Sequence, residues 1–594
     1  MLSLLCSCMF ITCVSSLPLG SKQVVTTKKQ YDEAIRSIMS EERVLSGRYN
    51  VHMSNKEAFA ARYMTEMREE DLKRYKDIIF LPSLPMSNTL ELIKRSKLYD
   101  VLRDMPKGAA LHIHERHSLS IKTLLELVWS SPDFKHLYVQ RRGKADEHRL
   151  AFYTVPPSTS WIRVESSNVT LEDILSHLTA RGLFSELAKS RWTDSELRWN
   201  ELDPVWNRYT DLICNINIRF RFLEALLESA LKDGLQYMEA RTGGFGKLYA
   251  LENDKRYQGS FGRHYIDPSG LTEVNMTIQF LQTFKVKHSD FIGMKFIYSV
   301  PRGISREKFR EHLLFAEKLH RVYSDFVIGF DLVGYEDRGH PLSYFLPDIL
   351  AFRRQGGVLP FFFHAGETHD HGGATSSNVL DAIVLGTKRI GHGFSIIHRP
   401  VLLDLVKNLS IPVEVCPVSN QIFGYIPEPR SHPAVHLMRA GVIVVISSDA
   451  PGVKGFDSFV VDWYYALVSW SLDFKNIKAL IINSLEYSAM NKTEKKAGRS
   501  LWKQQWEQFV DKLVDRRCNI EIAQQIKYFT STICKCEILI KRNNAVYIYQ
   551  FLQNTKRYGK VSRICTNFSN WARLFLSVAY SCTMVTGKQV SPCS

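Results

Sequence analysis

Cysteine is almost absent from most of this sequence. Only Cys214 and Cys416 lie between residues 17 and 517, whereas three cysteines precede residue 14 and six follow residue 517. A middle region with two cysteines does not depend on a disulfide framework for its fold. The carboxyl-terminal segment, in contrast, has enough cysteines to be cross-linked.

Long apolar runs are also scarce. After the first residues, no segment is long and apolar enough to cross a membrane. The stretch from Leu2 to Val14 is apolar and ends at small serines, although a basic start is missing. We expect residues 1–16 to be a cleaved signal peptide and the protein to be secreted and extracellular. The alternative is a buried or anchoring helix. Five Asn-x-Ser/Thr sequons are compatible with a secreted glycoprotein.

No zinc-finger, RNA-binding or helix-turn-helix signature accompanies the net charge of +16, so nucleic acid is not an expected partner. Half of this charge lies in the segment from Glu521 onward, where ten Lys/Arg face two Asp/Glu. This basic tail is either simply solvated or binds polyanions such as glycosaminoglycans.

The composition is that of a globular protein, with 45% hydrophobic and 23% charged residues. We expect a helical amino-terminal region at 17–105 and one large domain at 106–516. An irregular stretch at about 127–198 is interpreted as an insertion after the first strand. The basic, cysteine-containing tail at 517–594 is either disulfide-linked or poorly ordered.

Eight apolar runs rich in β-branched and aromatic residues predict buried parallel strands. They are Ala109–His114, Leu235–Arg241, Phe291–Val300, Val327–Val333, Leu359–His364, Arg389–Gly393, Pro412–Cys416 and Ile443–Ser448. Amphipathic stretches such as REKFREHLLFAEKLHRV separate several of them. Eight strands with helical intervals predict an α/β fold, specifically a (β/α)8 TIM barrel.

Metal-binding side chains stand at the ends of these runs. His112 and His114 form an i, i+2 pair on one face of a strand, and His364, His392 and Asp449 end three other runs. A single histidine there is more often a hydrogen-bonded core residue, but four aligned histidines reverse that expectation. Because the carboxyl ends of barrel strands meet at one mouth, we predict a catalytic divalent metal site, most often zinc, with a free water position.

Two further residues suit the chemistry of such a water. Glu367 lies three residues beyond His364, past a glycine turn, where it can transfer a proton to a heterocycle nitrogen. His392, between Gly391 and Gly393, can orient the attacking oxygen and stabilise the charge of an addition intermediate.

Several motifs carry a family resemblance between Tyr31 and Arg516. They are MPKGAALHIH, GFDLVGYED, PFFFHAGET, RIGHGF, IPVEVCPVSNQ and VISSDAP, with FLPSLP and YMEAR. The chain resembles the adenosine deaminases, most closely the adenosine deaminase-related growth factors, the secreted branch that includes extracellular adenosine deaminase 2. The resemblance implies hydrolytic deamination of adenosine or 2′-deoxyadenosine to the inosine product and ammonia. It also implies a homodimer formed through the helical amino-terminal region, and an insertion that binds a cell-surface receptor or glycans.

The resemblance also implies residue roles. One Zn2+ per chain would be held by His112, His114, His364 and Asp449. Glu367 would be the proton shuttle to purine N1, and His392 would orient the attacking hydroxide.

Three more residues would contact the substrate. The backbone N–H of Gly334 would bind purine N3, Trp206 would lie beside the ribose, and Glu115 would hold the ribose 5′-hydroxyl. Glu115 stands where the family has aspartate.

Ala450 is the main departure from the family pattern, because it replaces a second aspartate that hydrogen-bonds purine N7. Loss of such a bond costs on the order of 1–3 kcal/mol. Tyr335 replaces a histidine, and the segment after Asp449 is shortened. Three functions therefore stay open: an active secreted deaminase with weakened purine recognition, a catalytically impaired growth-factor-like or purine-binding signalling protein, and a zinc hydrolase that acts on another base.

Overall fold

The structure is a computed structural model that describes residues 26–46, 51–74, 80–141, 148–167, 169–178, 193–370, 372–456 and 458–540. The predicted signal peptide at residues 1–16 and most of the predicted tail lie outside the described residues.

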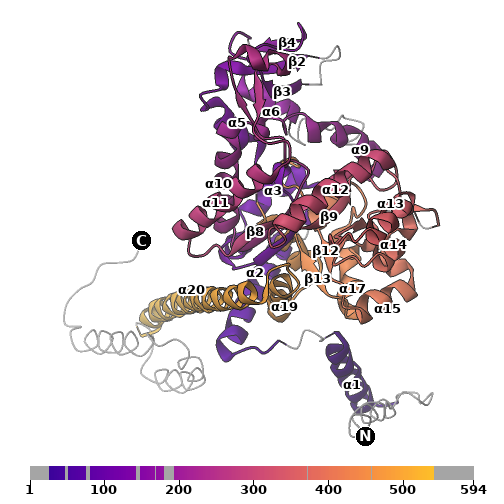
Figure 1. Ribbon diagram of the computed structural model, residues 1–594. Coiled ribbons are helices and arrows are strands. Elements are labelled where there is room, and N and C mark those ends of the chain that lie inside the picture. Colours follow the sequence, from indigo (N-terminus) through magenta and orange to yellow (C-terminus); the bar gives the residue numbers. More distant parts are fainter. Residues whose placement is uncertain are drawn as a thin grey trace, which may run out of the picture.

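Eight parallel strands form a closed barrel at the centre of the molecule (Figure 1). They are β1 Gly108–His114, β5 Leu235–Thr242, β8 Gly293–Pro301, β9 Val327–Val333, β10 His364–Ala365, β11 Ile390–His392, β12 Val413–Val415 and β13 Val444–Ile446. The strands pair in chain order as two sheets of four, β1-β5-β8-β9 and β10-β11-β12-β13. Parallel bridges between Phe330 and Phe361 and between Ile113 and Asp449 join the two sheets at both edges. The predicted (β/α)8 TIM barrel is therefore confirmed, with shorter strands in its second half than the sequence suggested.

Helices surround the barrel. They are α10 Ile216–Lys232, α11 Leu271–Lys287, α12 Arg306–Val322, α13 Leu342–Arg354, α14 Asn378–Val384, α15 Pro400–Asn408, α16 Pro417–Ile422, α17 Ala434–Ala440, α18 Val460–Ser469 and α19 Phe474–Glu486. Helix α12 coincides with the predicted amphipathic stretch. It begins after Ser305, whose side chain accepts from the backbone N–H of Lys308, and its apolar residues at helical spacing are buried on β8 and β9.

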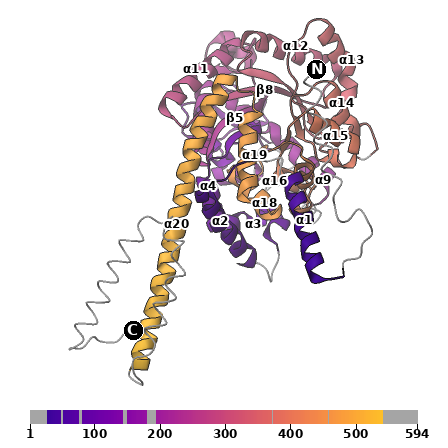
Figure 2. The ribbon, with the colours of Figure 1, turned by 90° about the horizontal axis from the view of Figure 1, so that it is seen from below.

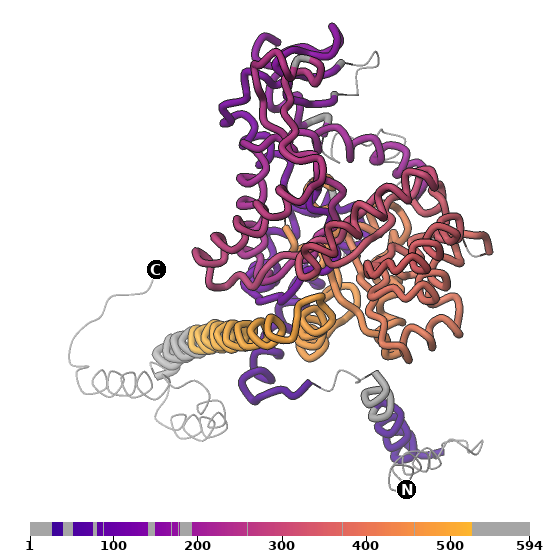
Figure 3. Tube along the Cα trace, in the orientation of Figure 1, coloured from indigo at the N-terminus to yellow at the C-terminus, as the bar shows by residue number. Residues whose placement is uncertain are grey.

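The amino-terminal region is helical where it is described. Its helices are α1 Lys28–Ser46, α2 Asn55–Arg74, α3 Met86–Lys94 and α4 Lys97–Asp104. Helix α2 packs against α4 and the long α20 (Lys492–Ile540), and α1 contacts α17. The tube in Figure 3 shows that α1, in indigo, lies at the outside of the fold. None of the described helices is both long and apolar enough to span a membrane.

Helix α20 changes the predicted domain division. The sequence suggested that a separate tail begins at residue 517, but α20 runs unbroken from Lys492 to Ile540 and projects beyond the barrel (Figure 2). Its first part packs on α2 and α19. Cys518 on this helix is disulfide-bonded, whereas the buried Cys214 and Cys416 are free, in agreement with a middle region that folds without disulfides.

The sequence suggested that the insertion after the first strand is irregular, but the structure shows strands and helices there. After α5 (Ile121–Trp129) it forms an antiparallel sheet in the order β3-β2-β4, with β2 Leu137–Arg141, β3 His148–Phe152 and β4 Trp161–Arg163. Helices α6 (Leu171–Leu178) and α9 (Ser195–Leu202) follow. These strands have three to five residues, which is too short for a clear alternation of polar and apolar positions. A second small hairpin, β6 Tyr249–Leu251 with β7 Arg263–Tyr265, follows β5.

Candidate metal centre and catalytic site

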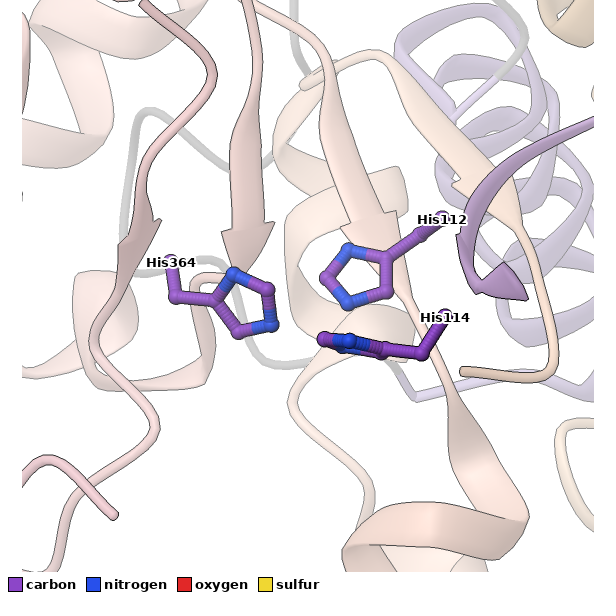
Figure 4. Close-up of side chains that lie close together, drawn as sticks. All are labelled: His112, His114 and His364. Atoms are coloured by element: carbon purple, nitrogen blue, oxygen red, sulfur yellow. The ribbon is translucent and has the colours of Figure 1, made fainter. Parts of the chain in front are cut away.

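Three imidazole rings converge at the carboxyl-terminal mouth of the barrel (Figure 4). One nitrogen of each of His112, His114 and His364 lies within 4.8 Å of the others. Burial lowers the pKa of His112 well below its usual value, with Arg241 adding to the effect, and burial also lowers the pKa of His114. The neutral imidazole is the form that binds a metal ion.

Buried carboxylates fix the orientation of two of these rings. The Nδ1 atom of His112 lies 2.7 Å from Glu414 Oε2, and the Nδ1 atom of His364 lies 2.6 Å from Asp331 Oδ2. Each carboxylate accepts the Nδ1 proton, so the Nε2 lone pair is left for a metal. The Nε2 atom of His112 is buried without a hydrogen-bond partner among the described residues. An orphaned, neutral nitrogen of this kind fits a divalent metal ion.

Arg241 links the two carboxylates from inside the barrel. Its Nε donates to Asp331 over 2.8 Å and its Nη2 donates to Glu414 Oε2 over 2.7 Å. The Nε atom of Arg389 donates to the other oxygen of Glu414, Oε1, over 2.5 Å. Burial opposes ionisation of both acids, but His364 and Arg241 lower the pKa of Asp331, and Arg241 and Arg389 lower that of Glu414. The two acids are therefore charged acceptors for the histidines.

Asp449 completes the cluster at the end of β13. Its Oδ1 lies 3.1 Å from His114 Nε2, a separation at which both atoms can bind one ion. Its Oδ2 accepts from Ser419 over 2.6 Å and from the fully buried Lys454 over 2.5 Å. Burial opposes the charge, but Lys454 and His114 lower the pKa of Asp449 well below its usual value. One oxygen is thus held by the protein and the other faces the histidines.

Glu367 is buried beside this cluster. Its backbone N–H, together with that of Gly366, donates to the Glu336 carboxylate over 3.1 Å. Burial raises the pKa of Glu367 well above its usual value, and the negative charge of Asp449 raises it further. A glutamate with a raised pKa can hold and release a proton near neutral pH.

His392 lies next to Glu367, with its Nδ1 atom 3.4 Å from Glu367 Oε1. This approach is not an ion pair, because burial and the neighbouring His112 lower the pKa of His392 well below its usual value. Both His392 and Asp449 have a positive φ, 61° and 59°, which is uncommon outside glycine and is often found at functional sites. Gly391 is also required, since a Cβ there would come within 2.9 Å of His112 Cε1.

The three predicted substrate residues have different surroundings. The Trp206 ring is 6.1 Å from the His114 ring, next to the cluster. Gly334 follows β9 with φ 95°, and nothing lies within 4 Å of the position of a Cβ, so a ligand can approach its backbone. Glu115 is fully buried and forms an ion pair with Arg219 of α10. Its other oxygen has no partner among the described residues.

The two main departures from the family pattern are packed into the site walls. Ala450 is fully buried in the main hydrophobic cluster, directly after Asp449. Tyr335 stacks on Trp199 of α9 with ring centroids 5.3 Å apart, and Phe423 also stacks on Trp199, with centroids 4.0 Å apart. The insertion thereby contributes a wall near the mouth of the barrel.

Several site residues were missed by the sequence analysis. They are Arg241, Asp331, Glu336, Glu414, Ser419, Asn420, His432 and Lys454. A signal was available for Arg241, Asp331 and Glu414, because charged residues inside otherwise apolar buried strands need a charged partner.

A closed eight-stranded barrel with a buried cluster of three histidines at its carboxyl-terminal mouth is an arrangement suited to hold a metal ion. Residues 185–503 match the family model described as adenosine deaminase. An adenosine deaminase from Aedes albopictus is 31% identical over 509 residues, which cover 83% of this chain and 90% of that protein. Human adenosine deaminase 2 is 30% identical over 493 residues, 81% of this chain and 93% of its own length.

The chain belongs to the adenosine deaminase family, which confirms the resemblance found in the sequence. Among solved structures, the Arabidopsis ADAL protein complexed with GMP is similar with a TM-score of 0.48 and 18% identity, covering 68% of this chain and 98% of that one.

Proposed function

We propose that this protein is a secreted, zinc-dependent adenosine deaminase that converts adenosine and 2′-deoxyadenosine to the inosine products and ammonia. The observation that carries the proposal is the cluster of His112, His114, His364 and Asp449 directly beside the buried Glu367 and His392. This arrangement brings four metal-type ligands and two proton-handling groups to one barrel mouth. The family of the chain supports adenosine as the substrate.

The four ligands suit one Zn2+ per chain. Three neutral nitrogens and one carboxylate oxygen are a donor set that zinc prefers, and they leave a position for water. Zinc bound there would supply a water of low pKa near neutral pH. The protein's own contribution is the fixed direction of each donor atom, set by Glu414, Asp331, Ser419 and Lys454.

Glu367 and His392 would perform the proton transfers. The protonated Glu367 donates to purine N1, which makes C6 more electrophilic, and later the carboxylate accepts a proton from the attacking water. His392 donates a hydrogen bond to the attacking oxygen and holds it opposite C6. Glu367 passes this second proton to the amino group, which then leaves as ammonia while the C6–O bond becomes the carbonyl of the inosine product. Both side chains are nearly fully buried, so bulk water does not compete for these protons.

For the substrate, we propose contacts from Gly334, Trp206 and Glu115. The open space beside Gly334 supports a backbone N–H contact to purine N3, and the position of Trp206 beside His114 supports a ribose contact. Glu115 would bind the 5′-hydroxyl through the oxygen that Arg219 does not occupy.

A catalytically impaired purine-binding or growth-factor-like protein is the second candidate function. Ala450 favours this function, because alanine has no carboxyl group to bind purine N7. The burial of Glu115 also favours it. A zinc hydrolase acting on another base is less favoured, since the chain belongs to the adenosine deaminase family.

The wild-type protein and Ala450→Asp distinguish these functions. We expect the wild type to convert adenosine slowly, and Ala450→Asp to raise kcat/KM at least about tenfold, the low end expected for one buried hydrogen bond. The measurement is the ultraviolet absorbance change of adenosine with purified, zinc-loaded protein. Ala450→Leu, which enlarges the side chain without a hydrogen-bonding atom, is the matched control and should not raise kcat/KM. No turnover by any of the three proteins, with zinc bound, would favour the purine-binding function.

Secretion and dimerisation are further parts of the proposal, as is a receptor or glycan partner. The homodimer is supported by the outer face of α1, where Tyr31, Ile35, Ile38 and Met39 are exposed by 56%, 38%, 39% and 49%. Their spacing forms one apolar stripe along the helix. A stripe of this kind on a peripheral helix is suited to pack against a second copy of the chain.

Replacing both Ile35 and Ile38 by glutamate is expected to convert the dimer into a monomer, because a buried interface does not tolerate unpaired charges. Light scattering of the secreted protein measures the mass of wild type and variant. Val286→Glu, an exposed apolar position on α11, is the control that should leave the mass unchanged. A wild-type protein that is already monomeric would contradict the proposal.

A further inference from the structure

Asn420 and His432 form a buried chain of hydrogen bonds behind the proton-handling pair. Asn420, in α16, places its Nδ2 atom 3.1 Å from Glu367 Oε1 and 3.2 Å from His392 Nδ1. Its Oδ1 atom lies 3.1 Å from His432 Nε2. The Nδ1 atom of His432 lies 3.0 Å from the backbone nitrogen of Ala434. Asn420 and His432 are 0% and 1% exposed, so these hydrogen bonds are shielded from bulk water.

The donor and acceptor of every hydrogen bond in this series follow from the bond at its end, between Ala434 and His432. The backbone N–H of Ala434 can only donate, so His432 Nδ1 is an acceptor. Burial lowers the pKa of His432 to about 3, so its ring is neutral and its proton is on Nε2. That proton is donated to Asn420 Oδ1, which fixes the amide orientation and turns the NH2 group toward Glu367 and His392.

The amide NH2 group has two hydrogens for two acceptors. One is donated to Glu367 Oε1 and the other to His392 Nδ1. His392 Nδ1 therefore carries a lone pair, and the ring proton of His392 is on Nε2. On Glu367, Oε1 is occupied as an acceptor, so Oε2 is the atom that takes up and releases a proton.

We propose that Asn420 and His432 are positioning residues that select the Nε2–H tautomer of His392 and direct the proton of Glu367 to Oε2. The inference rests on the proposed deaminase function for its kinetic consequence, but the hydrogen-bond directions do not depend on it. With the other tautomer, His392 would present a lone pair instead of an N–H to the attacking oxygen. These hydrogen bonds thus set the proton positions on His392 and Glu367 before the substrate binds.

A purely structural role is the competing interpretation. His432 follows η9 (Pro429–Ser431), and its ring lies 5.0 Å from Trp470, whose Nε1 donates to Pro429 over 3.1 Å. These contacts hold the turn before α17 in place. A role in packing alone would therefore depend on the shape of residue 432 and not on its donor atom.

The first test compares His432→Gln with His432→Leu in the full chain. Glutamine keeps an N–H near the position of Nε2, whereas leucine fills the space without a donor. We expect His432→Leu to lower kcat for adenosine about tenfold, the effect of one hydrogen bond, with KM changed less than about twofold, and His432→Gln to restore most of kcat. Trp470→Phe removes the neighbouring bond to Pro429 and should leave kcat unchanged. Equal losses in the two His432 variants, or the same loss in Trp470→Phe, would overturn the proposal.

The second test does not require turnover. The 15N chemical shifts of histidine-labelled protein report which ring nitrogen carries the proton, and His392→Asn assigns the signal. We expect a protonated Nε2 in the wild type and a mixture of tautomers in Asn420→Leu. A protonated Nδ1 in the wild type would overturn the inference even if the protein is an active deaminase. A protonated Nε2 in an inactive protein would instead support the inference and count against the proposed function.

Discussion

Replacement of Glu367 by glutamine is expected to lower kcat for adenosine by about 10²–10⁴-fold, the contribution typical of a positioned acid and base. Glutamine has the same shape and can still accept from Asn420 through its oxygen, so the packing of the site is preserved. It cannot release and take back a proton. Because the side chain is buried, bulk water does not reach its position to replace this function.

Steady-state kinetics at saturating adenosine measure the effect on kcat, and the zinc content shows that the metal site is intact. The control is Glu317→Gln in α12, which changes another buried glutamate, one that accepts the backbone N–H groups of Val358 and Leu359. We expect that variant to keep kcat within about twofold. A Glu367→Gln protein with unchanged kcat would show that proton transfer occurs through another group.

Replacement of His112 by alanine is expected to abolish zinc binding and to reduce turnover to background. The ring is fully buried, its Nδ1 is fixed by Glu414, and no described residue forms a hydrogen bond with its Nε2, which is left for the proposed ion. Removal of the ring leaves Glu414 with one hydrogen-bond donor fewer and the ion with one ligand fewer. In the wild type, zinc at a thousandfold above its dissociation constant should stabilise the fold by about 4 kcal/mol.

The measurements are metal content after dialysis and the shift of Tm on addition of zinc. The wild type treated with a chelator should lose turnover, and zinc should restore both turnover and Tm, whereas His112→Ala should respond to neither step. His264→Ala, on the partly exposed hairpin strand β7, is the control and should behave as the wild type. An active wild-type protein without metal would contradict the proposed mechanism.

The sequence by itself determined the barrel and the residues of its mouth. Eight apolar runs predicted the eight strands, because a buried parallel strand needs a continuous apolar segment of its own, and this requirement is local. The ends of these strands meet at one mouth in any (β/α)8 barrel. The convergence of His112, His114 and His364 therefore followed from strand positions alone.

The insertion and α20 were not determined in this way. The strands of the β3-β2-β4 sheet are too short to carry a periodic pattern. Helix α20 continues past residue 517 even though the composition of the sequence changes there. In both places the structure depends on contacts between segments, such as the packing of α2 against α20, and not on a repeating pattern within one segment.

Only the tertiary structure decided how the site residues are held and which protons they carry. Arg241 joins Asp331 and Glu414 across 90 and 173 positions of the sequence, and Asn420 reaches Glu367 across 53. Lysine is usually exposed on protein surfaces, yet Lys454 is fully buried against Asp449. Such contacts follow from burial, because a polar group removed from water must find a partner wherever the fold brings one. The sequence therefore specified the chemical groups of the site, and the closed barrel specified their hydrogen-bond partners.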